Sequence, residues 1–317
     1  MNTQLLGPTD LSISRLCYGA MRITGGWDEA ISAEQIERGI RVLESAVEAG
    51  YTFIDHADIY GSTNCETVHG LALKKHPEWR DRLIVATKCG IRWEDEPKPG
   101  MPHRYDFAAD YIRESCEGSL RRLNLDRIDL YQLHRPDFLA DPDDIAAAFI
   151  DLQKAGKVRY FGVSNFRPSL VAMIQSRLPF PLVSNQVEIS PLRLETFTDG
   201  TLDQCIEKKM TPLAWSPVAG GRLAPALEEN GKPPGDPIDL ATVQRLAPVL
   251  ADIASAYSVP PLAIVMAWLM RHPSKIIPIV GSVRPEMIRA AAQADSITLD
   301  RESWYRILLA ARGQKLP

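Results

Sequence analysis

The chain has 317 residues, of which 45% are hydrophobic and 24% are charged, and its net charge is −4 at pH 7. This composition is typical of a soluble globular protein with a sizeable core. The weak negative charge gives no reason to expect binding to nucleic acid or to an acidic membrane surface.

The first residues, the longest apolar stretch and the cysteines indicate in which cellular compartment the protein is expected. The first residues lack the charged start and apolar run of a signal peptide, and the longest apolar stretch, PPLAIVMAWLMRH, is too short to span a membrane. Five cysteines without a C-x-x-C pair favour reduced thiols over disulfides or a zinc site. We therefore expect a cytoplasmic protein with no membrane partner.

Strand-like and helical segments alternate along the chain. Residues 1–15 predict a short hairpin around Gly7 and Pro8, placed to cover the bottom of a barrel. Helical periodicity covers residues 33–50, 110–125, 141–156 and 240–258, with Asp141 as a start signal and Gly50 as a stop. Eight apolar runs predict strands: LCYGA, YTFIDHA, LIVATKCG, IDLYQLH, YFGVSNF, LVSNQVEI, PLAWSPV and KIIPIVGS.

Eight strand–helix units in about 300 residues predict a closed (β/α)₈ TIM barrel, with residues 1–317 forming one domain. A doubly wound open sheet is the competing architecture, but no G-x-G-x-x-G follows the first strand. Two long loops, residues 90–107 and 219–238, follow strand ends, so both are expected to overhang the active face.

Four polar side chains lie where three successive apolar runs end: Asp55, Tyr60, Lys88 and His134. In a barrel these strand ends meet at one mouth. Asp55 is expected to offset the buried charge of Lys88, and the nearby cation to lower the pKa of the Tyr60 phenol. The result is a proton donor able to protonate a carbonyl oxygen, with His134 orienting that oxygen.

Other interpretations remain for each residue alone. An aspartate at the end of a strand, such as Asp55, often only caps the next helix. A tyrosine before glycine, such as Tyr60, is usually a turn residue, and a single histidine after an apolar strand, such as His134, is more often structural than catalytic. His56 and Asp58 flank the site, but their side chains lie on opposite faces of one strand, so we expect no metal. The residues supply no electron source, and a bound hydride donor is the natural missing part.

The motifs around these residues resemble those of the aldo-keto reductase family. DHADIYG, ATKCG, LNLDRIDLYQLHRPD, GKVRYFGVSNF, NQVEISPL and AWSPVAGGRL follow the family's order over nearly the whole chain, and in detail they are most similar to a bacterial oxidoreductase subgroup. The resemblance implies hydride transfer from nicotinamide to the carbonyl carbon of a small-molecule aldehyde or ketone. It also implies that Tyr60 is the general acid, tuned by Lys88 and Asp55.

The resemblance further implies where the cofactor binds. Ser164, Asn165 and Gln186 match positions that hold the carboxamide, and Trp215 stands where an aromatic ring stacks on the nicotinamide. The remaining expected contacts follow the first, seventh and eighth strands: Gly19, Ala20, Met21, Ser216, Pro217, Gly221, Leu223, Gly281, Ser282 and Arg284.

One position departs from the family pattern. Met287 stands where an arginine usually grips the 2′-phosphate of NADP, and methionine cannot pair with phosphate. Arg284 is expected to compensate better than Arg289, because it lies in the loop. We expect NADP(H) as cofactor, with NAD(H) as the alternative.

The substrate pocket is expected to include Trp27 and Trp93, with Met21 and Trp215, which favours an apolar or aromatic carbonyl compound. Little chain follows the helical segment RESWYRILLAARG, which predicts an open, tolerant site. A non-catalytic, redox-sensing nicotinamide-binding module of the same fold is the alternative function, and a metal-dependent isomerase or lyase is a weaker one.

Overall fold

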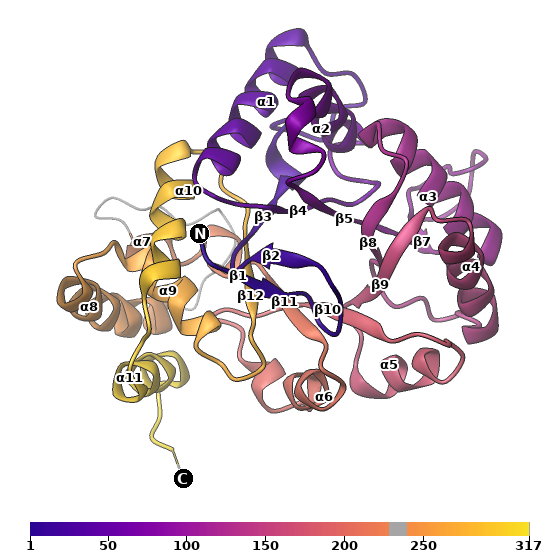
Figure 1. Ribbon diagram of the computed structural model, residues 1–317. Coiled ribbons are helices and arrows are strands. Elements are labelled where there is room, and N and C mark those ends of the chain that lie inside the picture. The colour runs from indigo at the N-terminus through magenta and orange to yellow at the C-terminus, as the bar shows by residue number, and fades with distance from the viewer. Residues whose placement is uncertain (228–239, 317) are drawn as a thin grey trace.

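The computed structural model describes residues 1–227 and 240–316. Eight parallel strands close into a barrel in their order along the chain, which confirms the predicted fold (Figure 1). All eight predicted strands are present: β3 (Cys17–Gly19), β4 (Phe53–Asp55), β5 (Ile84–Cys89), β8 (Ile128–Leu133), β9 (Val158–Ser164), β10 (Leu182–Glu188), β11 (Thr211–Trp215) and β12 (Ile277–Val280).

Helices surround this barrel (Figure 1). The helices that link the strands, or follow the last one, are α1 (Ala33–Glu48), α2 (Asn64–Lys75), α3 (Ala109–Leu123), α4 (Pro142–Lys154), α5 (Pro168–Gln175), α6 (Thr201–Lys208), α7 (Ala224–Leu227), α8 (Leu240–Tyr257), α9 (Pro261–Met270), α10 (Pro285–Ala292) and α11 (Arg301–Arg312). Short 3₁₀ turns are η1 (Ala20–Arg22), η2 (Pro77–Trp79), η3 (Glu195–Phe197), η4 (Ala219–Gly221) and η5 (Gln293–Ser296).

The predicted helix signals act as expected. The Asp141 carboxylate accepts a hydrogen bond from the backbone N–H of Asp143 at the start of α4. Gly50 has a φ of +93° just after α1, a conformation that glycine adopts without strain. Helix α9, expected to be a buried segment, is almost wholly enclosed.

An antiparallel hairpin of β1 (Thr3–Leu5) and β2 (Ser12–Ser14) closes one end of the barrel, as predicted (Figure 1). Its Leu6, Leu11 and Ile13 form one apolar cluster with the inward-facing residues of the barrel strands, including Phe53 and Ala86. The N-terminal end of the barrel is therefore filled by apolar side chains.

The inside of the barrel becomes polar toward its other end. Phe53 on β4 belongs to the apolar cluster, and two residues later Asp55 points into the same interior; Ala86 and Lys88 repeat this pattern on β5. Since alternate residues of a strand share a face, this change of polarity places the charged groups directly above a hydrophobic floor.

The two long loops differ in part from expectation. Residues 90–107 are not without structure, because they contain a small antiparallel pair, β6 (Ile91–Arg92) and β7 (Arg104–Tyr105). The first part of the second loop forms η4 and α7, and residues 228–239 of it lie outside the described residues.

No single helix in residues 1–227 and 240–316 is long and apolar enough to cross a membrane. Helices α8 and α9 reach that length and hydropathy only as a pair that bends by 90° between them.

Close packing of α2 on α3 depends on Gly70. A Cβ atom there would lie 2.2 Å from the carbonyl oxygen of Arg122, which is backbone and cannot move away. We expect Gly70→Ala to lower the free energy of unfolding by roughly 1–3 kcal/mol, as overpacking typically does.

Gly118→Ala is the matched control. Its Cβ would lie nearest the guanidinium of Arg122, 2.9 Å from Nη1, which is the end of a side chain rather than backbone and which pairs with Glu66. The gain in helix propensity of up to about 1 kcal/mol offsets a small shift of that side chain. Urea unfolding of both variants checks this, and equal stabilities would contradict the assigned contact between α2 and α3.

Candidate functional site

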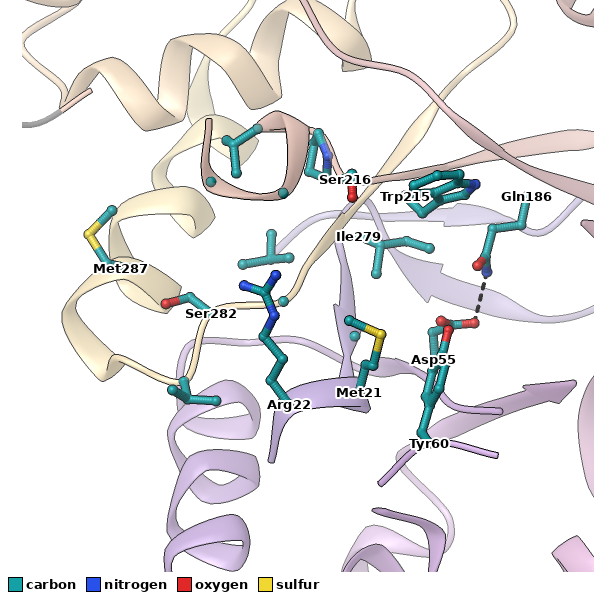
Figure 2. A pocket seen from close by; sticks show the side chains of 18 of the residues that line it. Met21, Arg22, Asp55, Tyr60, Gln186, Trp215, Ser216, Ile279, Ser282 and Met287 are labelled. Carbon is teal, nitrogen blue, oxygen red and sulfur yellow. Dashed lines mark hydrogen bonds between the residues drawn. The ribbon is translucent and has the colours of Figure 1, made fainter. Parts of the chain in front are cut away.

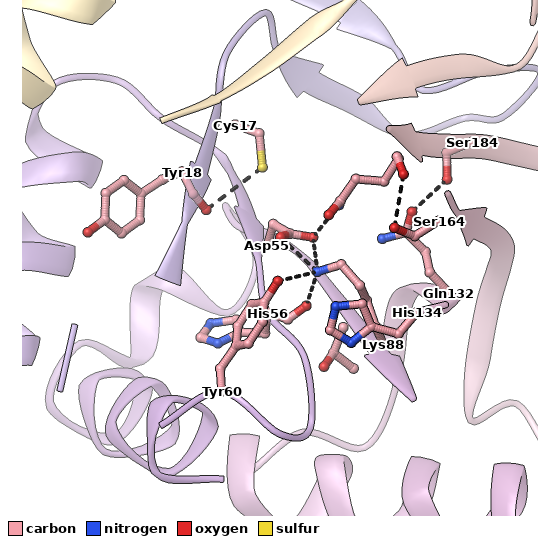
Figure 3. Close-up of polar contacts among 12 residues, drawn as sticks. Cys17, Tyr18, Asp55, His56, Tyr60, Lys88, Gln132, His134, Ser164 and Ser184 are labelled. Atoms are coloured by element: carbon pink, nitrogen blue, oxygen red, sulfur yellow. Dashed lines mark hydrogen bonds and ion pairs between the residues drawn. The ribbon is translucent and has the colours of Figure 1, made fainter. Parts of the chain in front are cut away.

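The four predicted polar residues meet at the C-terminal mouth of the barrel (Figure 3). Lys88 is fully buried, and its Nζ donates to Asp55 Oδ1 at 2.9 Å and to Asp55 Oδ2 at 2.8 Å. The same ammonium lies 3.2 Å from the Tyr60 hydroxyl oxygen and also donates to the carbonyl oxygen of His56. The expected pairing of Asp55 with Lys88 is confirmed.

The loop after β4 carries Tyr60 back over this ion pair. Backbone hydrogen bonds from His56 to Ala86 and from Asp58 to Lys88 tie the start of the loop to β5. Gly61 then adopts a φ of +56°, which turns the chain toward α2 and leaves the Tyr60 ring above Lys88. The position of the phenol is thus fixed by β5.

The Asp55 carboxylate and the Tyr60 hydroxyl keep the buried Lys88 ammonium charged. Burial lowers the pKa of Lys88, but the Asp55 carboxylate and the Tyr60 hydroxyl raise it further, so its pKa lies above the usual value. The lysine therefore stays cationic in the barrel interior.

The pKa of Tyr60 corrects one prediction. Burial raises it, and the nearby Lys88 cation lowers it by less, so the net pKa lies above the usual 10.0 rather than below it. The expectation of a lowered phenol pKa was therefore wrong in sign, although the opposing effect of Lys88 is present. Tyr60 is a neutral acid at physiological pH.

His134 lies beside Tyr60, with ring centroids 5.8 Å apart and the rings nearly perpendicular. Burial lowers the pKa of His134 well below its usual value, and the charges of Lys88 and Arg135 lower it further. The imidazole is therefore neutral, with one ring nitrogen able to donate a hydrogen bond.

A second chain of hydrogen bonds joins this quartet to the predicted cofactor residues. Gln186 Nε2 donates to Asp55 Oδ1 at 2.8 Å (Figure 2). The Ser164 hydroxyl donates to the backbone oxygen of Gln186, and the Asn165 amide donates to the Ser164 hydroxyl oxygen. The indole N–H of Trp215 donates to Asn165 Oδ1 at 2.9 Å.

A single cavity of about 830 Å³ runs from the quartet to the loop after β12 (Figure 2). The predicted site residues that line it are Gly19, Met21, Trp27, Asp55, Tyr60, His134, Ser164, Asn165, Gln186, Trp215, Ser216, Pro217, Gly221, Gly281, Ser282 and Arg284. The volume and elongated course suit a ligand larger than a simple carbonyl compound.

Four predicted residues do not line this cavity. Lys88 lies beneath it, and Ala20 and Leu223 are enclosed in the core. Trp93 stands behind Trp27, with ring centroids 5.9 Å apart, so it supports the wall rather than forming it.

Two arginines on the cavity wall were missed by sequence reasoning. Arg22 follows Met21 on η1, and Figure 2 shows it reaching toward Ser282. Arg135 directly follows His134 and lies over the Trp215 ring, with Cζ 5.3 Å from the ring centroid. Each directly follows a predicted site residue in the sequence, and this adjacency is the feature from which they could have been predicted.

Two arginines are candidates to replace the phosphate-binding arginine that is expected at position 287. Met287 does line the cavity, at the Ser282 end (Figure 2). Arg284 lines it too, with its backbone N–H donating to the Ser282 hydroxyl oxygen. Arg289 instead borders a separate hollow with Met1, so it is not placed to compensate for Met287.

His56 and Asp58 point in different directions, but the expected reason was wrong. Both follow Asp55, the last residue of β4, and residues two apart on one strand would share a face. His56 Nε2 lies 2.7 Å from His69 Nδ1, whereas Asp58 accepts from the Ser115 hydroxyl. Within residues 1–227 and 240–316, no three histidine, cysteine, aspartate or glutamate side chains are grouped closely enough to hold a metal ion.

The His56–His69 pair predicts acid sensitivity. Burial lowers the pKa of His56 well below the usual 6.5 and that of His69 to about 4. As pH falls below about 6.5, these histidines take up protons in the unfolded chain but not in the native state. The free energy of unfolding therefore decreases from about pH 6.5 toward pH 4. For His69 this loss amounts to roughly 3 kcal/mol.

His69→Gln removes this proton uptake. We expect its unfolding free energy to change less between pH 7 and about pH 4.5 than that of the parent protein. Urea unfolding at several pH values measures the slope, and an unchanged slope in the variant would show that His69 does not contribute.

Known proteins are similar to this chain in sequence along most of its length. The sequence model of the Aldo/keto reductase family matches residues 15–310. Oxidoreductase YdhF of Escherichia coli is 40% identical, over 98% of this chain and 98% of that protein. The 6-dehydroglucose reductase of Novosphingobium aromaticivorans is 38% identical, over 98% and 96% respectively.

Solved structures of aldo-keto reductases are similar to this chain in fold. A thermostable aldo-keto reductase in complex with the inhibitor epalrestat superposes with a TM-score of 0.80 at 26% identity, covering 98% of this chain and 100% of that one. The holo form of an aldo-keto reductase from Bacillus halodurans gives a TM-score of 0.78 at 27% identity, over 98% and 96%. The chain therefore belongs to the aldo/keto reductase family of oxidoreductases.

Proposed function

We propose that this protein reduces the carbonyl group of a small-molecule aldehyde or ketone, with Tyr60 as the proton donor and a nicotinamide cofactor as the hydride source. The observation that carries the proposal is the Tyr60 hydroxyl held 3.2 Å from Lys88 Nζ, at the edge of a cavity, with Asp55 fixing the lysine. A neutral acid beside a buried cation is suited to protonating a developing alkoxide.

Each residue then has a distinct task. Tyr60 donates its proton to the carbonyl oxygen, and the Lys88 charge stabilises the phenolate that remains. The neutral His134 imidazole donates a hydrogen bond to the same oxygen and fixes its orientation. Nicotinamide, when bound, supplies the hydride to the carbonyl carbon.

The cavity wall fits such a cofactor. Ser164, Asn165 and Gln186 line it with amide and hydroxyl groups, and Asn165 accepts a hydrogen bond from the indole edge of Trp215, whose ring also lines the cavity. Toward the other end the wall is open at Gly220, where a Cβ atom would meet nothing within 4 Å, so the backbone leaves room for a large ligand. Ser282 and Arg284 supply polar groups suited to phosphate near the start of α10.

The relatives support the carbonyl substrate. Proteins from Novosphingobium aromaticivorans and Agrobacterium fabrum, each 38% identical to this chain, are named 6-dehydroglucose reductase. That name describes a reductase acting on a small dehydrogenated sugar. We take a small aldehyde or ketone as the substrate class here.

Turnover gives the direct test. Absorbance of the reduced nicotinamide is followed with a panel of aromatic aldehydes, ketones and 6-dehydroglucose, using NADPH and NADH. Consumption that depends on the carbonyl compound, with the matching alcohol as product, is expected. Binding of reduced cofactor without turnover of any panel member would instead favour a nicotinamide-binding module.

We further propose a preference for NADP(H), with Arg284 contacting the 2′-phosphate. Arg284→Ala is then expected to weaken NADPH binding by about tenfold while changing NADH binding far less, since a charged hydrogen bond is lost only with the phosphate. Quenching of tryptophan fluorescence measures both dissociation constants without turnover.

Arg289→Ala is the matched control, because Arg289 does not line the cavity. Its NADPH to NADH affinity ratio should equal that of the parent protein. An unchanged ratio in Arg284→Ala would remove Arg284 as the phosphate ligand.

A further inference from the structure

The cavity holds a cation at its catalytic end that the proton-transfer chemistry does not use. Arg135 leaves the end of β8 immediately after His134 and reaches Trp215 on β11, three strands further around the barrel. Its half-buried side chain therefore extends along the mouth where a carbonyl substrate would enter.

The positive charge of Arg135 has no carboxylate to offset it in the part of the chain that the structure describes. The only carboxylate among the described cavity-lining residues is Asp55, and its oxygens already accept from Lys88 and Gln186. Stacking on the indole face leaves the N–H groups at the guanidinium edge available to acceptors. Among the described residues, Arg135 is therefore a charged group of this cavity that is available to a negatively charged ligand.

Arg135 also lies within electrostatic reach of the reacting groups. Burial is the largest influence on the pKa values of both Tyr60 and His134, but the charge of Arg135 lowers each of them as well. Arg135 directly follows His134, whose ring centroid lies 5.8 Å from that of Tyr60, so a group bound to Arg135 lies at the same end of the cavity as the proton donor.

Several side chains that line this cavity together with Tyr60 and Arg135 are apolar. Trp27 meets the Tyr60 ring edge to face, with ring centroids 6.4 Å apart, and Ile91 and Trp215 line the same cavity. An apolar or aromatic body fits between them, with its carbonyl at Tyr60 and an acceptor at Arg135.

We propose that Arg135 is a specificity-determining residue that selects carbonyl substrates bearing a carboxylate or similar oxyanion. This rests on the proposed reductase function and names its substrate class. Arginine suits the task because its planar fork binds two oxygens of one oxyanion together.

A matched pair of substrates tests the proposal. Para-formylbenzoate and its methyl ester differ in charge but carry the same aldehyde on the same ring. In the parent protein kcat/KM for the acid is expected to exceed that for the ester by about tenfold or more, as a hydrogen-bonded charge pair typically gives. Arg135→Gln should bring the ratio to near one, mainly through KM, and Arg135→Lys should restore part of it.

Two controls distinguish selection of substrate charge by Arg135 from a general effect of the substitution on the active site. Arg82→Gln, at the opposite end of the barrel just before β5, should keep the parent's ratio. Benzoate gives a second readout that needs no turnover of a charged substrate. Its inhibition constant against benzaldehyde should rise about tenfold in Arg135→Gln.

The outcomes are distinct. A ratio near one in the parent, or a ratio that survives Arg135→Gln, overturns the role of Arg135 while the reductase function stands. If no aldehyde, charged or neutral, is reduced by the parent protein, the proposed function itself has failed.

Discussion

Replacing Tyr60 by phenylalanine is expected to lower kcat for carbonyl reduction by about 10²- to 10⁴-fold, the range that a positioned general acid contributes. The variant loses the hydroxyl that lies 3.2 Å from Lys88 Nζ, while its ring keeps the edge contacts with Trp27 and His134. Cofactor affinity, measured by fluorescence titration, should change by less than about threefold, because the loss falls on the proton transfer.

Tyr305→Phe is the matched control, since that ring lies on α11, remote from the cavity. Its kcat should equal that of the parent. Equal turnover by Tyr60→Phe and the parent would mean that another group donates the proton.

The pH dependence of the parent protein follows from the same residue. Because the pKa of Tyr60 lies above 10.0, the phenol stays protonated through neutral and mildly alkaline pH. Its titration should therefore cause no loss of reduction rate between pH 6 and about pH 9. A decline in kcat centred near neutrality and absent from Tyr60→Phe would contradict the raised pKa.

Much of this site could be predicted from the sequence because the barrel topology brings the residues together. Asp55, Lys88 and His134 are far apart in the chain, yet each ends or follows an apolar run, and parallel strand ends converge. The alternation that puts Phe53 and Asp55 on one face is local, so it too can be recognised in the amino-acid sequence alone.

The features that could not be predicted depend on packing between distant segments. The direction of the Tyr60 pKa shift required knowing how fully Trp27 and His134 enclose the phenol, because burial opposes the lysine charge. Likewise Arg284 and Arg289 are five residues apart, and only the orientation of α10 places one in the cavity and the other outside it.

Removing the Asp55 carboxylate should have the largest effect on stability. Asp55→Asn leaves the Lys88 ammonium buried without its counter-ion, and breaking a buried pair in this way typically costs about 3–5 kcal/mol. The exposed pair of Arg306 and Asp252 gives a matched control, because Asp252→Asn should cost no more than about 1 kcal/mol. Urea unfolding measures both.

The double variant Asp55→Asn, Lys88→Met separates stability from chemistry. With both charges gone, no ion remains to be desolvated, so most of the lost unfolding free energy should return. Activity should not return, since the phenolate that Tyr60 leaves behind has lost the cation that stabilises it. Recovery of turnover together with stability would show that the pair serves the fold alone; recovery of stability without turnover assigns the buried lysine to proton transfer.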